Sequence, residues 1–324
     1  MRVEIEEIKS LLLKVLIKNG LNEEDANTIL NEYLYGQLSG KTSHGLASFP
    51  NIVNKLAKGV SNWRIIREDE SYALIDGQGS VGSLLGKFAI DLAVKKAKQK
   101  GIALVGMNNM FSYMMPGYYA KLAADQDMIG LVVDNSRSRV VPYGGTEPKL
   151  GTNPIGFSVP TKTIPFVLDM ATAVRGMGEV KLAAKLGEKL YSGMAVDKEG
   201  KPTTDPNAFN ALNPAGGYKG YGLALAIEIL AGSFVRAKMG GRIQDSLDRG
   251  YLFIVINPTI FVNLDTFKQE VADLLDEIKS CKPAEGFKEV MIPGERATRN
   301  RKRNIEFGYL EIDEKLLNDI KALL

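Results

Sequence analysis

The sequence contains very few of the side chains that most metal and thiol sites require. Its 324 residues include one cysteine, Cys281, and one histidine, His44. A single cysteine cannot form an intramolecular disulfide, and metal sites built from several thiolates are excluded. A mechanism that needs two histidines is excluded within one chain, and a cysteine–histidine pair could only be formed by Cys281 and His44. Imidazole acid–base chemistry in this chain therefore depends on His44.

Long apolar runs and a strong imbalance of charge are also absent. No run approaches the roughly 20 apolar residues of a membrane span. The N-terminal segment MRVEIEEIKS carries acidic residues and lacks the apolar region of a signal peptide. The 41 Lys and Arg residues nearly balance the 38 Asp and Glu residues, for a net charge of +3. We therefore expect a cytoplasmic protein that binds neither membranes nor nucleic acids.

The rest of the composition is typical of a globular enzyme, with 45% apolar and 24% charged residues. Strand-like runs alternate with helical periodicity, which predicts an α/β fold with a mixed, mostly parallel sheet flanked by helices. We expect a helical N-terminal segment over residues 1–70, an α/β domain over 71–300 and a C-terminal helical tail over 301–324. The predicted strands lie at 71–76, 102–107, 129–135, 156–170, 251–257 and near 289–292; the predicted helices include 83–100 and 172–186.

A glycine motif, GQGSVG at 77–82, has the G-x-G-x-x-G spacing of a dinucleotide fingerprint between a strand and a helix. In that motif the pyrophosphate lies on the helix N-terminus. However, the next strand ends in Asn108 and Asn109, where the fingerprint needs an acidic residue for the ribose. The motif alone favours a Rossmann site and a plain glycine-rich turn equally.

Several segments, in this order, resemble the malate/L-lactate dehydrogenase family of non-Rossmann NAD(P)-dependent oxidoreductases, which includes ureidoglycolate, sulfolactate and diketogulonate dehydrogenases or reductases. The resemblance favours a simple turn at the glycine motif, and within the family it is slightly stronger to the ureidoglycolate branch. The segments that carry it are SHGLASFP (43–50), PGYYA (116–120), GGTEPKLGTNP (144–154), VLDMAT (167–172), PTTDP (202–206), KGYGLAL (219–225) and IPGE (292–295).

This resemblance implies a homodimer that transfers a hydride between NAD or NADP and a small 2-oxo or 2-hydroxy acid, with both ligands bound in the 71–300 domain. The positions that match cofactor contacts of the family are Ser136, Asp169, Met170, Ala171, Tyr218, Lys219, Gly294, Glu295 and Arg296. Lys219 lies between glycines, which would let it approach a phosphate or ribose closely. Asp169 could accept hydrogen bonds from ribose or orient the imidazole, whereas its alternative role is a helix N-cap. We expect Asp169 and Lys219 to support His44 in catalysis.

The resemblance assigns His44, in a Ser43-His44-Gly45 turn, as the proton donor, since an imidazole can donate and accept protons near neutral pH. Two family positions differ here. Relatives usually have an arginine for the substrate carboxylate where this chain has Ser48, and a second histidine where it has Ser112. A hydroxyl cannot replace the charge-assisted guanidinium–carboxylate pair.

Two hypotheses account for these differences. The enzyme uses His44 alone, with Arg137 or Arg139 as a replacement anchor in a substrate site that also contains Ser43, Ser48 and Ser112. Alternatively, the protein binds NAD(P) but is catalytically degenerate. We expect the first, and we expect no metal site.

Overall fold

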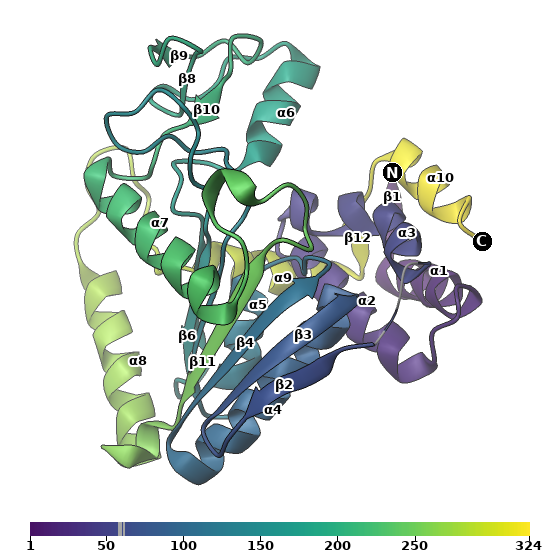
Figure 1. Cartoon of the computed structure of the whole chain (residues 1–324), viewed down its shortest axis with the longest axis vertical. Coiled ribbons are helices and arrows are strands. Elements are labelled where there is room, and N and C mark those ends of the chain that lie inside the picture. Colours follow the sequence, from purple (N-terminus) through teal and green to yellow (C-terminus); the bar gives the residue numbers. More distant parts are fainter. Residues whose placement is uncertain (58–59, 61) are drawn as a thin grey trace.

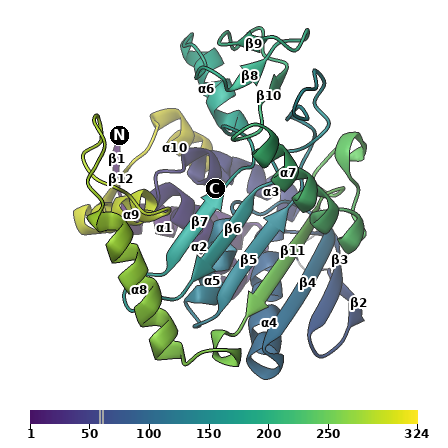
Figure 2. The same cartoon turned by 90° about the vertical axis from the view of Figure 1, so that its left-hand side faces the viewer.

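A computed structural model describes residues 1–57, 60 and 62–324. Its centre is a seven-stranded sheet with the order β2-β3-β4-β11-β5-β6-β7 (Figures 1 and 2). Two smaller sheets, one of two strands and one of three, lie outside it. The strands of the central sheet are β2 (Arg64–Glu68), β3 (Tyr72–Ser80), β4 (Ile102–Met110), β5 (Ile129–Asp134), β6 (Ile155–Val159), β7 (Phe166–Met170) and β11 (Gly250–Ile256).

The α/β class and the mixed sheet are confirmed, but the expectation of a mostly parallel sheet is wrong. Among these seven strands only β3 and β4 pair in parallel, and the other neighbours are antiparallel. β4 and β5 do run in the same direction, as a crossover through a helix requires. The late strand β11 inserts between them and is antiparallel to both. Local alternation of strands and helices cannot reveal such an insertion.

Helices cover both faces of this sheet. On one face, α4 (Gly82–Lys100) and α5 (Pro116–Ala124) pack on Tyr251 and Phe253 of β11. Leu252 lies between these two residues in β11 and points to the other face of the sheet. There it packs against Ile227 of α7 (Tyr218–Ala231). The alternation along β11 therefore fills two cores, as the period of two in a strand requires. Figure 2 shows α7 in front of the strands and α4 and α5 behind them.

The two ends of the chain meet in a separate helical region (Figure 1). β1 (Arg2–Glu4) pairs antiparallel with β12 (Tyr309–Glu311). Leu310 and Leu317 share a core with Ile8 and Leu12. The predicted N-terminal segment and C-terminal tail therefore pack together. The elements of this region are α1 (Ile5–Lys18), α2 (Glu23–Leu38), α3 (Ile52–Leu56) and α10 (Glu314–Lys321).

Two elements lie across the boundaries of the three predicted parts. β2 lies before residue 71, yet it is the edge strand of the central sheet. α9 (Glu295–Phe307) crosses the predicted boundary at residue 300 without a break. The division into three parts otherwise stays a prediction. Among the described residues, no helix is both long and apolar enough to span a membrane.

A small lobe stands apart at the top of Figure 1. It contains α6 (Met177–Leu186), and the short strands β8 (Ala195–Val196), β9 (Pro202–Thr203) and β10 (Ala211–Leu212) form its sheet. The helix predicted over 172–186 begins only at Met177, because Ala173 bridges to Pro214 in extended conformation. The strand predicted near 289–292 is wrong, since these residues form no ladder and lead into α9. The helix α8 (Leu264–Ser280) lies below this lobe, along the left-hand edge of the molecule in Figure 1.

Candidate active site

A cleft of about 920 Å³ lies beside the ends of the central strands. It is lined by Ser43 and His44 from the 3₁₀ turn Thr42–His44, by residues 112–116, by the end of β7 and by the segment before α6. Ten of the residues predicted from the sequence line it, drawn from four separate stretches of chain: Ser43, His44, Ser48, Ser112, Ser136, Arg137, Arg139, Asp169, Met170 and Ala171. The fold therefore brings most of the predicted site together.

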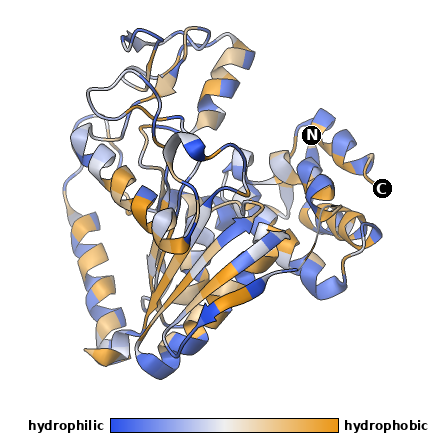
Figure 3. Ribbon diagram, in the orientation of Figure 1, coloured by the Kyte–Doolittle hydropathy of each residue, from blue (hydrophilic) through white to orange (hydrophobic). Residues whose placement is uncertain are grey.

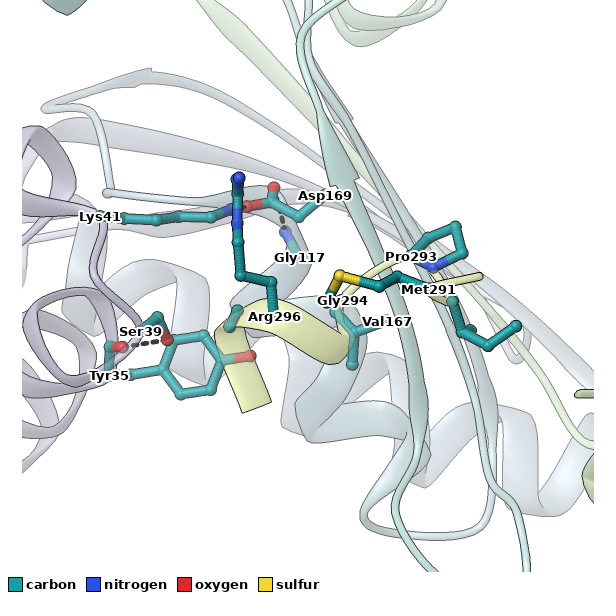
Figure 4. Close-up of a pocket in the computed structure, with 12 residues that line it drawn as sticks. Tyr35, Ser39, Lys41, Gly117, Val167, Asp169, Met291, Pro293, Gly294 and Arg296 are labelled. Atoms are coloured by element: carbon teal, nitrogen blue, oxygen red, sulfur yellow. Dashed lines mark hydrogen bonds and ion pairs between the residues drawn. The ribbon is translucent and has the colours of Figure 1, made fainter. Parts of the chain in front are cut away.

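A second pocket of about 360 Å³ adjoins this cleft and shares Lys41 and Asp169 with it (Figure 4). Its lining is mostly apolar, from Tyr35, Val167 and the segment that leads into α9. Two predicted cofactor residues, Gly294 and Arg296, also line it. The other three, Tyr218, Lys219 and Glu295, line neither pocket. Tyr218 and Lys219 stand exposed at the start of α7.

Asp169 joins the two pockets at the end of β7. Its Oδ1 accepts a hydrogen bond of 3.1 Å from the backbone nitrogen of Gly117, and its Oδ2 forms an ion pair with Lys41. A Cβ at position 117 would lie 2.4 Å from that of Asp169, so only glycine permits this approach. The N-cap alternative for Asp169 is wrong, because the next helix begins at Met177 with Gly176 as its cap. The carboxylate instead orients a cation between the two pockets.

His44 is open to the cleft, with Nδ1 3.0 Å from the hydroxyl of Ser43. The surrounding walls of the cleft remove much of its hydration, and this desolvation lowers the pKa of the imidazole below its ordinary value of 6.5. Asp169 opposes the shift, whereas Lys41 and Arg249 add to it. The imidazole is therefore neutral at pH 7 in the absence of a bound anion.

A single histidine makes this pKa directly measurable. Proton NMR of the protein should show one imidazole that titrates below pH 6.5. Lys41→Met should raise its pKa, because a nearby cation disappears, and Asp169→Asn should lower it, because a nearby anion disappears. The two substitutions remove opposite charges from the same ion pair, so the pKa of His44 should shift in opposite directions. A wild-type pKa above 6.5, or shifts of the same sign, would contradict this electrostatic description.

The two serines that stand where relatives carry charged or imidazole side chains are both engaged in local hydrogen bonds. Ser48 donates its hydroxyl proton to the backbone oxygen of Ser43 at 2.8 Å. Ser112 donates to the backbone oxygen of Tyr113 at 2.9 Å and accepts from Nη1 of Arg249 at 2.7 Å. Neither hydroxyl replaces the charge that is missing. Ser112 is in direct contact with two cations, Arg249 through its hydroxyl and Lys55 through its backbone oxygen.

Arg249 lies at the start of β11, where it crosses to the end of β5. Its Nε donates to the backbone oxygen of Asn135 at 2.6 Å, and its Nη2 pairs with Asp134. Asp134 also accepts from the hydroxyl of Tyr113 at 3.0 Å. Burial raises the pKa of Asp134 to about 6, although Arg249 and Tyr113 act to lower it. This buried ion pair faces the same cleft as His44.

Sequence reasoning missed five cations of this cleft: Lys41, Lys55, Arg175, Lys181 and Arg249. Lys41 belongs to the same short segment as His44, SGKTSHG, and this proximity in sequence could have indicated that it lines the same cleft. Lys55 donates to the backbone oxygen of Ser112 at 3.3 Å, and burial lowers its pKa. For Arg249 the only signal was a cation immediately before a wholly apolar strand. The predicted anchors Arg137 and Arg139 do line the cleft, on its exposed rim.

The remaining predicted cofactor residues have mixed surroundings. The hydroxyl of Ser136 accepts a hydrogen bond of 3.0 Å from the backbone of Thr152. Glu295 is held by Lys279 and Arg299, each at 2.6 Å. Partial burial would raise its pKa, but Lys279 and the backbone of Ile292 lower it to about 2. The carboxylate of Glu295 therefore forms ion pairs that stabilise the start of α9. The neighbouring Arg296 is exposed and lines the small pocket.

The glycine motif lies within β3 and the start of α4 and has a packing role. A Cβ on Gly77 would lie 2.7 Å from that of Met110, and one on Gly82 would lie 2.0 Å from the backbone oxygen of Phe111. Asp76 accepts a hydrogen bond of 2.9 Å from Asn109, one of the two asparagines that ended the predicted strand. The three glycines line neither described pocket.

Gly79 provides a test of the Rossmann alternative. It has a φ of +76°, and among the described residues no atom lies within 4 Å of the place that a Cβ would occupy there. Gly79→Ala should lower stability by about 1–2 kcal/mol through backbone strain and leave the affinity for NADH or NADPH unchanged. Fluorescence titration of the cofactor checks this. A tenfold loss of affinity would instead favour pyrophosphate binding at the motif.

Comparison with known proteins gives consistent results. The model of the malate/L-lactate dehydrogenase family matches residues 3–321. The L-sulfolactate dehydrogenase of Methanocaldococcus jannaschii is 42% identical over 326 residues, which cover 97% of this chain and 94% of that protein. The solved structure of sulfolactate dehydrogenase from that organism has a TM-score of 0.93 at 40% identity, and covers 100% of this chain and 96% of that one.

The expected preference for the ureidoglycolate branch is not supported. The ureidoglycolate dehydrogenase (NAD(+)) of Escherichia coli K12 is 32% identical over 319 residues, covering 94% of this chain and 91% of that protein. These relatives are all named dehydrogenases, which implies a nicotinamide cofactor and gives no support to a degenerate protein. The family match spans nearly the whole chain, so the protein is an oxidoreductase that belongs to the malate/L-lactate dehydrogenase family.

Proposed function

We propose that this protein transfers a hydride between NAD(P)H and a small 2-oxo acid, or in reverse from the 2-hydroxy acid. The observation that carries the proposal is the meeting of His44, Lys41 and Asp169 where a cation-rich cleft joins a second, mostly apolar pocket. Reduction of a 2-oxo acid requires an acid for the developing alkoxide and cations for the carboxylate. The cleft contains both.

The small pocket fits a nicotinamide cofactor in several respects. A Cβ at Gly294 would lie 2.2 Å from the backbone oxygen of Val167, so the chain is drawn in closely here. Tyr35 and Met291 offer apolar contact, and the exposed guanidinium of Arg296 suits a phosphate group. Asp169 could accept from ribose hydroxyls. When bound, the cofactor supplies the hydride. Tyr218 and Lys219 remain proposed contacts at the start of α7, and Ser136, Met170 and Ala171 remain proposed contacts in the cleft.

His44 then acts as the general acid in the reductive direction. It is neutral before the substrate enters, and a substrate anion beside it would favour the imidazolium. Its Nδ1 contacts Ser43, which leaves Nε2 as the nitrogen for the substrate oxygen. In the oxidative direction the neutral imidazole accepts the hydroxyl proton. Asp169 and Lys41 set the local field as positioning residues.

The chemistry of the cleft favours a substrate with more than one acidic group. Its cationic side chains outnumber its carboxylates, and a surplus of one sign concentrates ligands of the opposite sign. The name of the 42%-identical relative contains such a substrate, L-sulfolactate, which carries a carboxylate and a sulfonate. We therefore rank sulfolactate and malate above lactate and ureidoglycolate. The cationic side chains are Lys41, Lys55, Arg137, Arg139, Arg175, Lys181 and Arg249; the acidic ones are Asp134, Asp169, Glu179 and Asp245.

A homodimer in the cytoplasm completes the proposal. α8 has no buried residue, and both α7 and α8 carry exposed apolar side chains. Figure 3 shows that the two helices lie on the same side of the ribbon and that both contain hydrophobic residues. Exposed apolar faces of this kind are typical of subunit interfaces. Nicotinamide cofactors are present in the cytoplasm, so the proposed reaction can take place there. The exposed side chains are Leu223, Leu225, Ile229 and Leu230 on α7, and Leu274 and Ile278 on α8.

The test is a steady-state assay of NADH and NADPH oxidation with sulfopyruvate, oxaloacetate, pyruvate and 2-oxoglutarate. Turnover should be detected with at least one of them, and with one cofactor preferred. Cofactor binding without turnover on any substrate would favour the degenerate alternative. Absence of both turnover and cofactor binding would refute the proposal altogether.

A further inference from the structure

The cleft has a charged group at its buried end that the sequence did not suggest for substrate binding. Ser48 is uncharged and its proton is donated to Ser43, so it cannot hold a carboxylate. Arg137 and Arg139 lie on the exposed rim, where solvent weakens an ion pair. Arg249 is different, because its side chain is only 17% exposed and its guanidinium is fixed by other groups.

We propose that Arg249 is the residue that anchors the substrate carboxylate, with Ser112 and Lys55 beside it. This inference rests on the proposed function and names the group that holds the acid. The chemical class of ligand is a 2-oxo or 2-hydroxy carboxylate, bound through the acid group next to the reacting carbon. Such an anchor limits the orientations in which the reacting carbon can face His44.

The hydrogen bonds of Arg249 leave donors for a ligand. A guanidinium has five N–H groups in a rigid fork. Within the described part of the chain, three of them have acceptors: the backbone oxygen of Asn135, the hydroxyl of Ser112 and the carboxylate of Asp134. One N–H on each terminal nitrogen therefore remains for a ligand, and a carboxylate can accept from both nitrogens with its two oxygens.

The charges around Arg249 leave this wall of the cleft positive. Asp134 is its direct partner and neutralises one charge. Lys55 adds a second cation, which donates to the backbone of Ser112. The acid that faces Lys55 is Glu32, which is fully buried, and this burial raises its pKa. Glu32 does not line the cleft, whose lining holds more cations than carboxylates, so a ligand carboxylate at Arg249 meets an excess of positive charge.

Arg249 also acts on His44, since it is one of the cations that lower the pKa of the imidazole. An anion bound to Arg249 would compensate that charge and raise the pKa of His44. Substrate binding would in this way help to protonate the group that must donate the proton. The coupling supplies a readout that a merely structural role of Arg249 would not produce.

The experiment uses oxalate as a probe of the site, in the presence of saturating oxidised cofactor. Arg249→Met alone leaves the carboxylate of Asp134 buried without its cation, so the comparison is between Asp134→Asn and the double variant Asp134→Asn/Arg249→Met. The double variant should bind oxalate about 10- to 100-fold more weakly than Asp134→Asn, the ratio typical of a lost charged hydrogen bond. Cofactor affinity should be equal in the two. Arg67→Met, which removes an exposed arginine from β2, should bind oxalate as the wild type does.

Two further readouts accompany the binding constant. In the wild type and in Asp134→Asn, oxalate should raise the pKa of His44 measured by NMR, whereas in the double variant it should not. For any 2-oxo acid that the enzyme reduces, KM should rise in the double variant much more than for the methyl ester of the same acid. If either variant fails to fold, Arg249→Lys replaces it, and this variant should bind oxalate at least several-fold more weakly than the wild type.

The outcomes separate this inference from the proposed function. Equal oxalate affinity in Asp134→Asn and the double variant, or no binding by the wild type, would overturn the role of Arg249 even if 2-oxo acids are reduced. Oxalate binding that depends on Arg249 in a protein without turnover would support the anchor and refute the proposed activity.

Discussion

His44→Ala is expected to lower kcat/KM for the best 2-oxo acid by about 10²–10⁴-fold, the usual contribution of a positioned general acid. The loss should appear mainly in kcat, because the imidazole is proposed to act on charge that develops in the transition state. No second histidine exists in the sequence to replace it. Steady-state kinetics at several pH values measure the loss of activity. They also show whether the limb of the pH–rate profile that reflects titration of the imidazole has disappeared.

Cofactor affinity serves as the control for this variant. His44 does not line the smaller pocket, so the dissociation constant of NADH or NADPH should stay within about twofold of the wild-type value. If turnover survives at more than a tenth of the wild-type rate, another group donates the proton. Lys41 would then be the next candidate, because it lines both pockets.

Arg249→Met is expected to destabilise the protein by about 3–5 kcal/mol at pH 8, the typical cost of leaving one member of a buried ion pair alone. Asp134 is 2% exposed and would keep only Tyr113 as a side-chain partner among the described residues. Urea unfolding, followed by circular dichroism, measures the free energy. The double variant Asp134→Asn/Arg249→Met should recover much of the loss, because no buried charge then remains at this pair.

The pH dependence of this effect has a definite sign. The pKa of Asp134 is raised to about 6 in the folded protein, so the folded state holds its proton more strongly than the unfolded state. Without Arg249 that pKa rises further, since an attractive cation is removed. The stability difference between wild type and Arg249→Met should therefore be smaller at pH 5 and grow as the pH rises above 6. A difference independent of pH would mean that Asp134 is not the unpaired charge.

The sequence was a good guide wherever neighbours along the chain determine the structure. Asn22, for example, precedes a helix, and its side chain caps α2 by accepting from the backbone of Asp25 at 2.8 Å. The strands β4, β5 and β11 follow from short apolar runs. The motif around His44 also indicated a residue that lines the larger cleft. These features depend on local propensity and on segments that recur as units.

The parts that could not be predicted depend on contacts between distant residues. Lys41 meets Asp169 across 128 positions of sequence, and Arg249 meets Asp134 across 115. The residues that flank Lys41 and Arg249 in the sequence do not show whether each side chain lines a cleft or lies on the open surface. The direction of strand pairing failed for the same reason, because β11 arrives from far along the chain to separate β4 from β5.

The late insertion of β11 has a consequence for how this protein is made. Until residues 250–256 leave the ribosome, β4 and β5 lack the strand that joins them and each presents an unpaired edge. Exposed edges of this kind recruit other chains, so the nascent protein passes through an aggregation-prone stage that lasts from the end of β5 at Asp134 to the start of β11 at Gly250. Arg249 precedes this strand directly. The step that closes the sheet during biogenesis therefore also delivers the last cation of the cleft, and incomplete chains acquire neither.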